Sequence, residues 1–176
     1  GHGYIREWGM EQCIRDLRIA QIYAGTNGVQ SQDLIGRKTI KCGGAFIAEY
    51  ITEIRDFAND LDTDLNFIKD ATLDAATEIE AITQFIIEQA AENVEFPNSA
   101  AVDYLHAVGL LSFSYMFAKI AAAAKDKSGD FYQNKLALAQ YFVERILPDI
   151  DARIAKIKAG SDLIMGFSED YFTNQA

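Results

Sequence analysis

The chain has 176 residues, of which 49% are hydrophobic and only two are proline. This length and composition are typical of one domain, or slightly more, with a sizeable hydrophobic core. The low number of prolines favours long helices over a disordered or turn-rich all-β chain. The formal charge of −10 excludes nucleic acid and anionic membrane surfaces as good partners, and no run of eighteen apolar residues predicts a membrane span.

Helical periodicity predicts three helices in the first third of the chain. The first covers about residues 6–22, where apolar residues recur at helical spacing. A glycine-rich break precedes the second helix, which starts at Thr26 or Asn27 and runs through Lys38. Gly43 and Gly44 separate it from a third helix that ends near residues 61–64.

Three longer helices follow. The clearest has an apolar stripe at spacings of three and four: Ile68, Ala71, Ala75, Ile79, Ile82, Ile86 and Ala90. Pro97-Asn98-Ser99 predicts a stop and a new cap before a helix from Ala101 to about Lys125, which is apolar on several faces and therefore the most buried. The last helix covers about residues 131–157 with a kink at Pro148. The tail from Gly160 shows no sustained period.

Short connections make neighbouring helices antiparallel. We therefore predict an all-α fold: a helical hairpin segment followed by an antiparallel four-helix bundle. Charge supports a division near Gly43-Gly44, because residues 1–42 hold six basic and four acidic side chains, whereas the remainder holds ten and twenty-two. We expect residues 1–42 to meet an anionic ligand through backbone N–H groups, and residues 43–176 to form an acidic helical bundle.

Neither the cysteines nor the other usual ligands predict a metal site. Cys13 and Cys42 are too few for a zinc cluster or a disulfide framework, which indicates a reducing compartment such as the cytoplasm. His2 and His106 lack second ligands. Asp60, Asp62 and Asp64 alternate as in a calcium loop, but the glycine and the terminal glutamate of such a loop are missing. Glu78, Glu80 and Glu88 lack the Glu-x-x-His partners of a di-iron bundle, so we expect them to be solvated.

Several separated motifs follow one another in the first 38 residues: Gly3-Tyr4, Arg15-Asp16-Leu17-Arg18-Ile19, Tyr23, Gly25-Thr26-Asn27-Gly28, Gln30 and Gly36-Arg37-Lys38. In this order they resemble the C-terminal helical domain of the acyl-CoA dehydrogenases. The acidic bundle looks like the extra C-terminal extension of the larger members. Because the sequence has no starting Met or signal-peptide pattern, we interpret it as the C-terminal fragment of such an enzyme.

The resemblance implies a parent flavoenzyme that introduces a trans α,β double bond into an acyl-CoA. The α-proton leaves as a base removes it, while a hydride passes from the β-carbon to N5 of FAD. Electrons then go to an electron-transfer flavoprotein. The family shares flavin contacts across subunits, so the resemblance also implies a homo-oligomer, with a dimer expected.

The resemblance also assigns the site residues. Tyr23, Ala24 and Gly25 would contact the substrate: Tyr23 would line the acyl pocket, and the Ala24 N–H would hold the thioester carbonyl. Thr26 and Gly28 would contact FAD, and Gly1 and Gly3 would form a turn against the flavin of a partner subunit. We expect structural roles for Arg15, Asp16 and Arg18. Arg37 and Lys38 suit either a helix end or a phosphate contact.

Ala24 departs from the family pattern, because many members carry a glutamate there as the general base. A methyl group cannot accept a proton, so the chain offers no catalytic residue at this position. Three explanations remain open: a base on an earlier helix outside this sequence, a non-dehydrogenating relative, or a deliberately introduced alanine. We expect the fragment alone to be inactive. The rival interpretation is a non-catalytic helical interaction or scaffold module.

Overall fold

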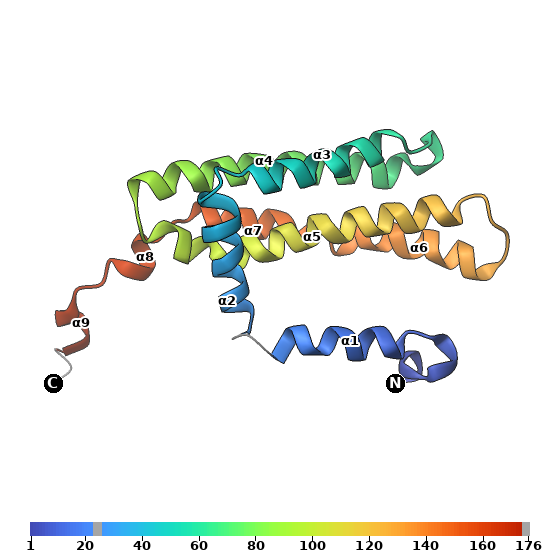
Figure 1. Cartoon of the computed structure of the whole chain (residues 1–176), viewed down its shortest axis with the longest axis horizontal. Helices are drawn as coiled ribbons and strands as arrows, with labels where there is room; N and C mark the ends of the chain where they lie inside the picture. Colours follow the sequence, from blue (N-terminus) through green and yellow to red (C-terminus); the bar gives the residue numbers. More distant parts are fainter. Residues whose placement is uncertain (23–25, 174–176) are drawn as a thin grey trace.

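The structure is a computed structural model that describes residues 1–22 and 26–173. That part of the chain is helical and contains no strand (Figure 1), which confirms the all-α class. The longer helices are α1 (Glu11–Ile22), α3 (Ala45–Asn59), α4 (Asn66–Glu92), α5 (Phe96–Ala124), α6 (Asp130–Arg145) and α7 (Asp149–Lys158). The shorter elements are η1 (His2–Tyr4), η2 (Arg6–Trp8), α2 (Thr26–Gln32), the π-helical η3 (Asp33–Ile40), η4 (Thr63–Leu65), α8 (Asp162–Met165) and α9 (Glu169–Thr173).

An antiparallel bundle of α3, α4, α5 and the α6–α7 pair forms the body of the molecule, as predicted (Figure 1). α5 is its central helix, because α4, α6, α7 and α2 all pack against it. Tyr104, Ala107 and Leu111 of α5 are fully buried, as the apolar character of several of its faces predicts. By length and composition alone, α5 is also long and apolar enough to cross a membrane.

The apolar stripe of α4 faces the core, which confirms the sequence prediction for this helix. Ile68, Ile79 and Ile86 have no exposed surface. Ile79 and Ile86 belong to a cluster of buried side chains from all the bundle helices, among which are Ile54, Leu111, Phe142 and Ile157. Ile68 belongs to a second cluster with Leu65, Ala118 and Ala139. Burial of this apolar surface is the main driving force for the bundle.

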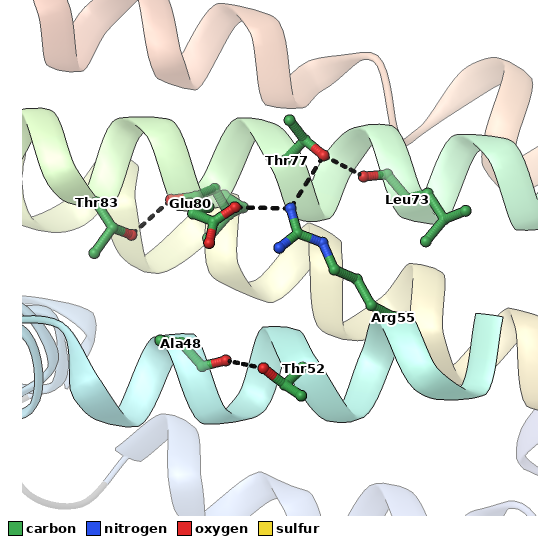
Figure 2. Close-up of polar contacts among 8 residues, drawn as sticks. Ala48, Thr52, Arg55, Leu73, Thr77, Glu80 and Thr83 are labelled. Atoms are coloured by element: carbon green, nitrogen blue, oxygen red, sulfur yellow. Dashed lines mark hydrogen bonds and ion pairs between the residues drawn. The ribbon is translucent and has the colours of Figure 1, made fainter. Parts of the chain in front are cut away.

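A polar bridge also joins α3 to α4 (Figure 2). Arg55 donates from Nη2 to Oε2 of Glu80 at 2.8 Å and to Oγ1 of Thr77 at 3.2 Å. The Thr77 hydroxyl in turn donates to the carbonyl of Leu73 at 2.9 Å. Because the pair is largely open to water, it orients the two helices more than it stabilises them.

Residues 26–40 form one helical segment, α2 followed by η3, which we call the crossing segment. It lies across the bundle and packs against α5, α4 and α3 (Figure 1). Ser31, Ile35 and Thr39 are its buried residues. α1 lies apart from the bundle, and every described side chain in it except Glu11 is exposed.

Two helices begin at residues other than those predicted. The first begins at Glu11 and not near Arg6, because Gly9 takes a left-handed φ of 71° and closes a 3₁₀ turn there. α5 begins at Phe96 instead of Ala101. Pro97 does not stop this helix, since it lies in the first turn, where no backbone N–H is needed.

The last predicted helix is in fact two helices. α6 ends at Arg145, and α7 starts at Asp149 with Pro148 as its N-cap, so the expected kink is a complete break. The second predicted helix differs as well. It continues past Lys38 to Ile40 and changes from α to π geometry at Asp33.

Candidate functional site

The predicted flavin and substrate contacts fall at two places in the first 28 residues. Tyr23, Ala24 and Gly25 lie outside the described residues. Thr26 is the first residue of α2, and Gly28 lies two residues further along it. Gly1 and Gly3 belong to an exposed 3₁₀ turn, in which the N–H of Tyr4 donates to the carbonyl of Gly1 at 3.1 Å.

α1 separates these two places. The turn of residues 1–4 lies before its first residue and α2 lies after its last (Figure 1). A helix of 12 residues is about 18 Å long. One chain therefore does not bring Gly1 and Gly3 together with Gly28. Only a second molecule or a large ligand would join the two places.

Gly28 is open to an approaching group. Its backbone is exposed, and a Cβ placed on it would meet nothing within 4 Å. Its carbonyl accepts a hydrogen bond from the buried hydroxyl of Ser31 at 2.8 Å, which fixes the first turn of the crossing segment. Gly28 is therefore not sealed inside the bundle.

The charged residues of the motifs have partners within their own helices. Arg15 pairs with Glu11, Asp16 accepts from Gln12 at 2.7 Å, and Arg18 donates to Gln21 at 2.9 Å. The structural roles expected for Arg15, Asp16 and Arg18 stay a prediction. Arg37 and Lys38 both reach Asp33, at 3.0 Å and 3.4 Å, with their side chains largely exposed.

A buried group of hydroxyls lies where the crossing segment meets α4 and α5, and no sequence pattern predicted it. It consists of Thr39, Thr83 and Tyr104, each almost or fully without exposed surface. Burial raises the pKa of the Tyr104 phenol, whereas hydrogen bonding with Thr83 and Thr39 acts in the other direction. The only sequence signal was a threonine inside the apolar pattern of α4.

Glu78, which we expected to be solvated, is partly buried instead. It lines a groove of about 600 Å³ between α4 and α7, together with Asp151, Lys158 and apolar side chains. Burial raises the pKa of Glu78, Asp151 and Asp74 raise it further, and Lys158 opposes them. The sequence prediction for Glu78 was wrong because the α7 residues that line the groove beside it lie far away in the sequence.

Within residues 1–22 and 26–173, no three His, Cys, Asp or Glu side chains gather as metal ligands. Cys13 is exposed, and Cys42 is partly buried with its thiol near the carbonyl of Lys38 at 3.1 Å. In the tail, Phe167, Tyr171 and Phe172 contact one another and remain more than half exposed.

Two protein-family models match the chain in order. A model described as "Acyl-CoA dehydrogenase, C-terminal domain" matches residues 1–39, and one described as "Acetyl-CoA dehydrogenase C-terminal like" matches residues 50–168. The second match covers more than half of the chain.

Curated relatives agree with these matches. The chain is 28% identical to the broad-specificity linear acyl-CoA dehydrogenase FadE5 of Mycobacterium tuberculosis, over 98% of this chain and 31% of the relative. It is 28% identical to the 3-methylmercaptopropionyl-CoA dehydrogenase of Ruegeria pomeroyi, over 94% and 29%. It is 25% identical to a butyryl-CoA dehydrogenase of Syntrophomonas wolfei, over 98% and 30%. The chain thus spans about 30% of the length of the relatives it matches.

Proposed function

Because the chain belongs to the acyl-CoA dehydrogenase family and matches its C-terminal domains, we propose that it is the C-terminal part of an FAD-dependent enzyme that dehydrogenates an acyl-CoA thioester. The observation that carries this proposal is the pair of family models, which together cover most of the chain in the order expected for one enzyme. The names of the relatives share a coenzyme A thioester as the substrate class.

In this proposal, residues 1–42 form one wall of the flavin and thioester site, and residues 43–176 form the bundle that supports it. The described residues fit such a wall, because Gly28 and the Gly1–Gly3 turn expose backbone that a planar group can approach. They do not by themselves enclose a ligand. The rest of the enclosure belongs to the remainder of the enzyme and, for Gly1 and Gly3, to a partner subunit in a dimer.

When bound, FAD supplies the hydride acceptor for the β-carbon of the substrate. The part of this chain is to position the thioester. As the family resemblance implies, the backbone N–H of Ala24 would donate to the thioester carbonyl and stabilise the negative charge that develops there. Tyr23 would line the acyl pocket, and Thr26 and Gly28 would contact the flavin. The Ala24 side chain cannot take the α-proton, so the base is a carboxylate elsewhere in the full-length enzyme.

The proposal includes an electron-transfer flavoprotein as the electron acceptor and the cytoplasm as the compartment. The 176-residue chain alone is expected to be inactive, because it lacks most of the flavin site and a base. The rival function, a non-catalytic interaction or scaffold module, is favoured by one observation, namely Ala24 in place of the usual glutamate.

Purification of the full-length protein separates the two functions. We expect a yellow protein with the visible absorbance of bound flavin, which is bleached when an acyl-CoA substrate is added. A colourless protein that takes up no added FAD would contradict the dehydrogenase proposal and favour the scaffold function.

The Ala24→Glu variant then tests the position of the base. General bases contribute about 10²–10⁴ in rate. If the base lies elsewhere in the enzyme, we expect a second carboxylate at residue 24 to bring no gain of that size. Ala48→Glu, on the exposed face of α3, controls for the added charge. A gain of about a hundredfold or more with Ala24→Glu alone would show that the natural protein has no other base.

A further inference from the structure

The outer face of α5 carries an apolar stripe that the bundle does not bury. Tyr104, Leu111 and Ala118 mark the core face of this helix. On the opposite face, residues recur at alternating spacings of four and three, which is the spacing of helices that pack on another helix: Val102, His106, Gly109, Phe113, Met116 and Ile120. Phe113, Met116 and Ile120 are 59%, 44% and 36% exposed. One apolar face of α5 thus has no partner within the described part of the chain.

This face is also free of charge over most of its length. No Asp, Glu, Lys or Arg lies on α5 between Asp103 and Lys119. Because each chain has a net charge of −10, two copies repel each other at most other surfaces. The outer face of α5 is a place where two copies can approach closely.

The stripe combines a protruding side chain with a hollow. A hollow of about 240 Å³ lies over Gly109, between α5 and α7, with Phe113 at its rim and Asp149 and Arg153 on its far side. It exists because Gly109 has no side chain, and a Cβ placed there would meet nothing within 4 Å. Since a cavity of about 150 Å³ can bind benzene, an aromatic ring can enter this hollow.

One orientation of two copies fills both hollows. When the two α5 helices run antiparallel about a two-fold axis between residues 109 and 113, Phe113 of each copy faces Gly109 of the other. In a parallel pair, the two Phe113 rings would face each other and both hollows would stay unfilled. A surface that carries both the ring and its hollow complements a second copy of itself, as a two-fold interface requires.

We propose that the outer face of α5 is a contact between two copies of this chain, in which Phe113 of each copy enters the hollow at Gly109 of the other. The exposed parts of Phe113, Met116 and Ile120 amount to on the order of 250 Å² per copy, whereas a stable dimer buries in total about 1,200–2,000 Å². The contact is therefore weak by itself. It is separate from the flavin contact proposed for Gly1 and Gly3, so in the full-length enzyme it joins dimers to one another.

Sedimentation of the 176-residue chain at increasing concentration tests the contact. We expect a monomer–dimer equilibrium with a Kd on the order of 10–100 μM, which tightens when salt screens the repulsion between the acidic chains. Phe113→Ala should weaken it at least about tenfold. Phe46→Ala is the matched control, because Phe46 of α3 is also 59% exposed, and it should leave the Kd unchanged. A chain that stays monomeric, or equal effects of the two variants, would overturn the proposal.

A second set of variants tests the antiparallel pairing. Gly109→Phe fills the hollow and should weaken the dimer, because the new ring meets Phe113 of the other copy. The double variant Gly109→Phe with Phe113→Ala moves the ring to the opposite side of the contact and should restore the dimer. Circular dichroism melts of dilute samples check that each single chain stays folded. A folded double variant without restored association would overturn this pairing.

The full-length protein decides between a second copy and the remainder of the enzyme as the partner of this face. We expect Phe113→Ala to halve the mass of the concentrated assembly and to leave the spectrum of bound flavin unchanged. A variant that is less thermostable but has an unchanged mass would show that the remainder of the enzyme covers α5, and this would overturn the proposal. A full-length protein that binds no flavin would overturn only the proposed function, because the contact involves no flavin.

Discussion

Arg153 of α7 donates from Nη1 to Oδ1 of Asp103 on α5 at 2.8 Å, across the seam of the bundle. The two side chains are 31% and 21% exposed, so the pair is partly shielded from water. It lies just beyond the break at Pro148. Because the chain breaks at Pro148, α7 is not a continuation of α6, and the pair helps to orient α7 on α5.

This ion pair should be measurable in a double-mutant cycle. With Arg153→Met and Asp103→Asn, we expect a coupling free energy of about 1 kcal/mol in chemical denaturation. The exposed pair of Arg37 and Asp33 is the matched control, with an expected coupling of about 0.3 kcal/mol. Equal coupling in both pairs would show that the partial burial of Arg153 and Asp103 does not strengthen their interaction.

Phe142 is the aromatic anchor of α6. It is 1% exposed and stacks on Phe117 of α5, with ring centroids 4.6 Å apart. Phe142→Ala should lower the free energy of unfolding by about 3–5 kcal/mol, because it leaves a cavity between the two helices. Phe113→Ala removes the same atoms at a residue that is 59% exposed, and it should change the free energy of unfolding by at most about 0.5 kcal/mol. A thermal or denaturant melt compares the two, and similar losses would contradict this core.

The two glycines between the crossing segment and α3 should differ in their tolerance of a side chain. Both have left-handed φ values, 60° at Gly43 and 81° at Gly44, which alone costs an alanine about 1 kcal/mol. A Cβ on Gly44 would also lie 3.2 Å from Cδ1 of Ile87, whereas one on Gly43 meets nothing within 4 Å. We expect Gly44→Ala to be the more destabilising in denaturant melts. The reverse order would contradict the close approach of this turn to α4.

Glu78 should make stability depend on pH. Its pKa is raised in the folded chain by burial and by Asp151 and Asp74, with Lys158 opposing. The folded state therefore binds a proton more readily than the unfolded chain, whose glutamates titrate at about 4.3. The free energy of unfolding falls as the pH rises from that value through the raised pKa of the folded state.

The substitution Glu78→Gln tests this sign. We expect it to stabilise the chain at neutral pH and to flatten the dependence of stability on pH above the unfolded value, as measured by denaturant titration at several pH values. Glu92→Gln, at the exposed end of the same helix, controls for the loss of one negative charge. A Glu78→Gln chain that is less stable at neutral pH would reverse the assignment.

The helices predicted correctly are those in which spacing alone decides the outcome. The stripe from Ile68 to Ile86 recurs at helical spacing, and all of its residues are buried except Ala71, which is partly buried. The errors lie where a local rule has two outcomes. Pro97 stops a helix in its interior and starts one in its first turn, and Pro148 kinks a helix or ends it. Gly9 gave no sequence signal of its left-handed conformation.

Only part of the candidate site could be predicted from the sequence. The motif residues Gly3, Thr26 and Gly28 are recognisable because they follow one another in a fixed order. A helix between Gly3 and Thr26 was predicted over about residues 6–22, and α1 (Glu11–Ile22) confirms it over most of that range. The buried hydrogen bond between Thr83 and Tyr104 was not predicted, because the two residues lie 21 positions apart and neither position indicates its partner.

The amino-acid order by itself determined the helical class, the apolar faces and the family motifs, because each of these depends on residues a few positions apart. The tertiary structure alone decided which buried hydroxyls are hydrogen-bonded to each other, that Glu78 is partly buried, and that Arg153 pairs with Asp103. Helical periodicity specifies the face of a helix that is buried, but it leaves the partner of that face undetermined, since many pairings bury the same apolar area. Polar groups that must find partners in the interior then select one of them.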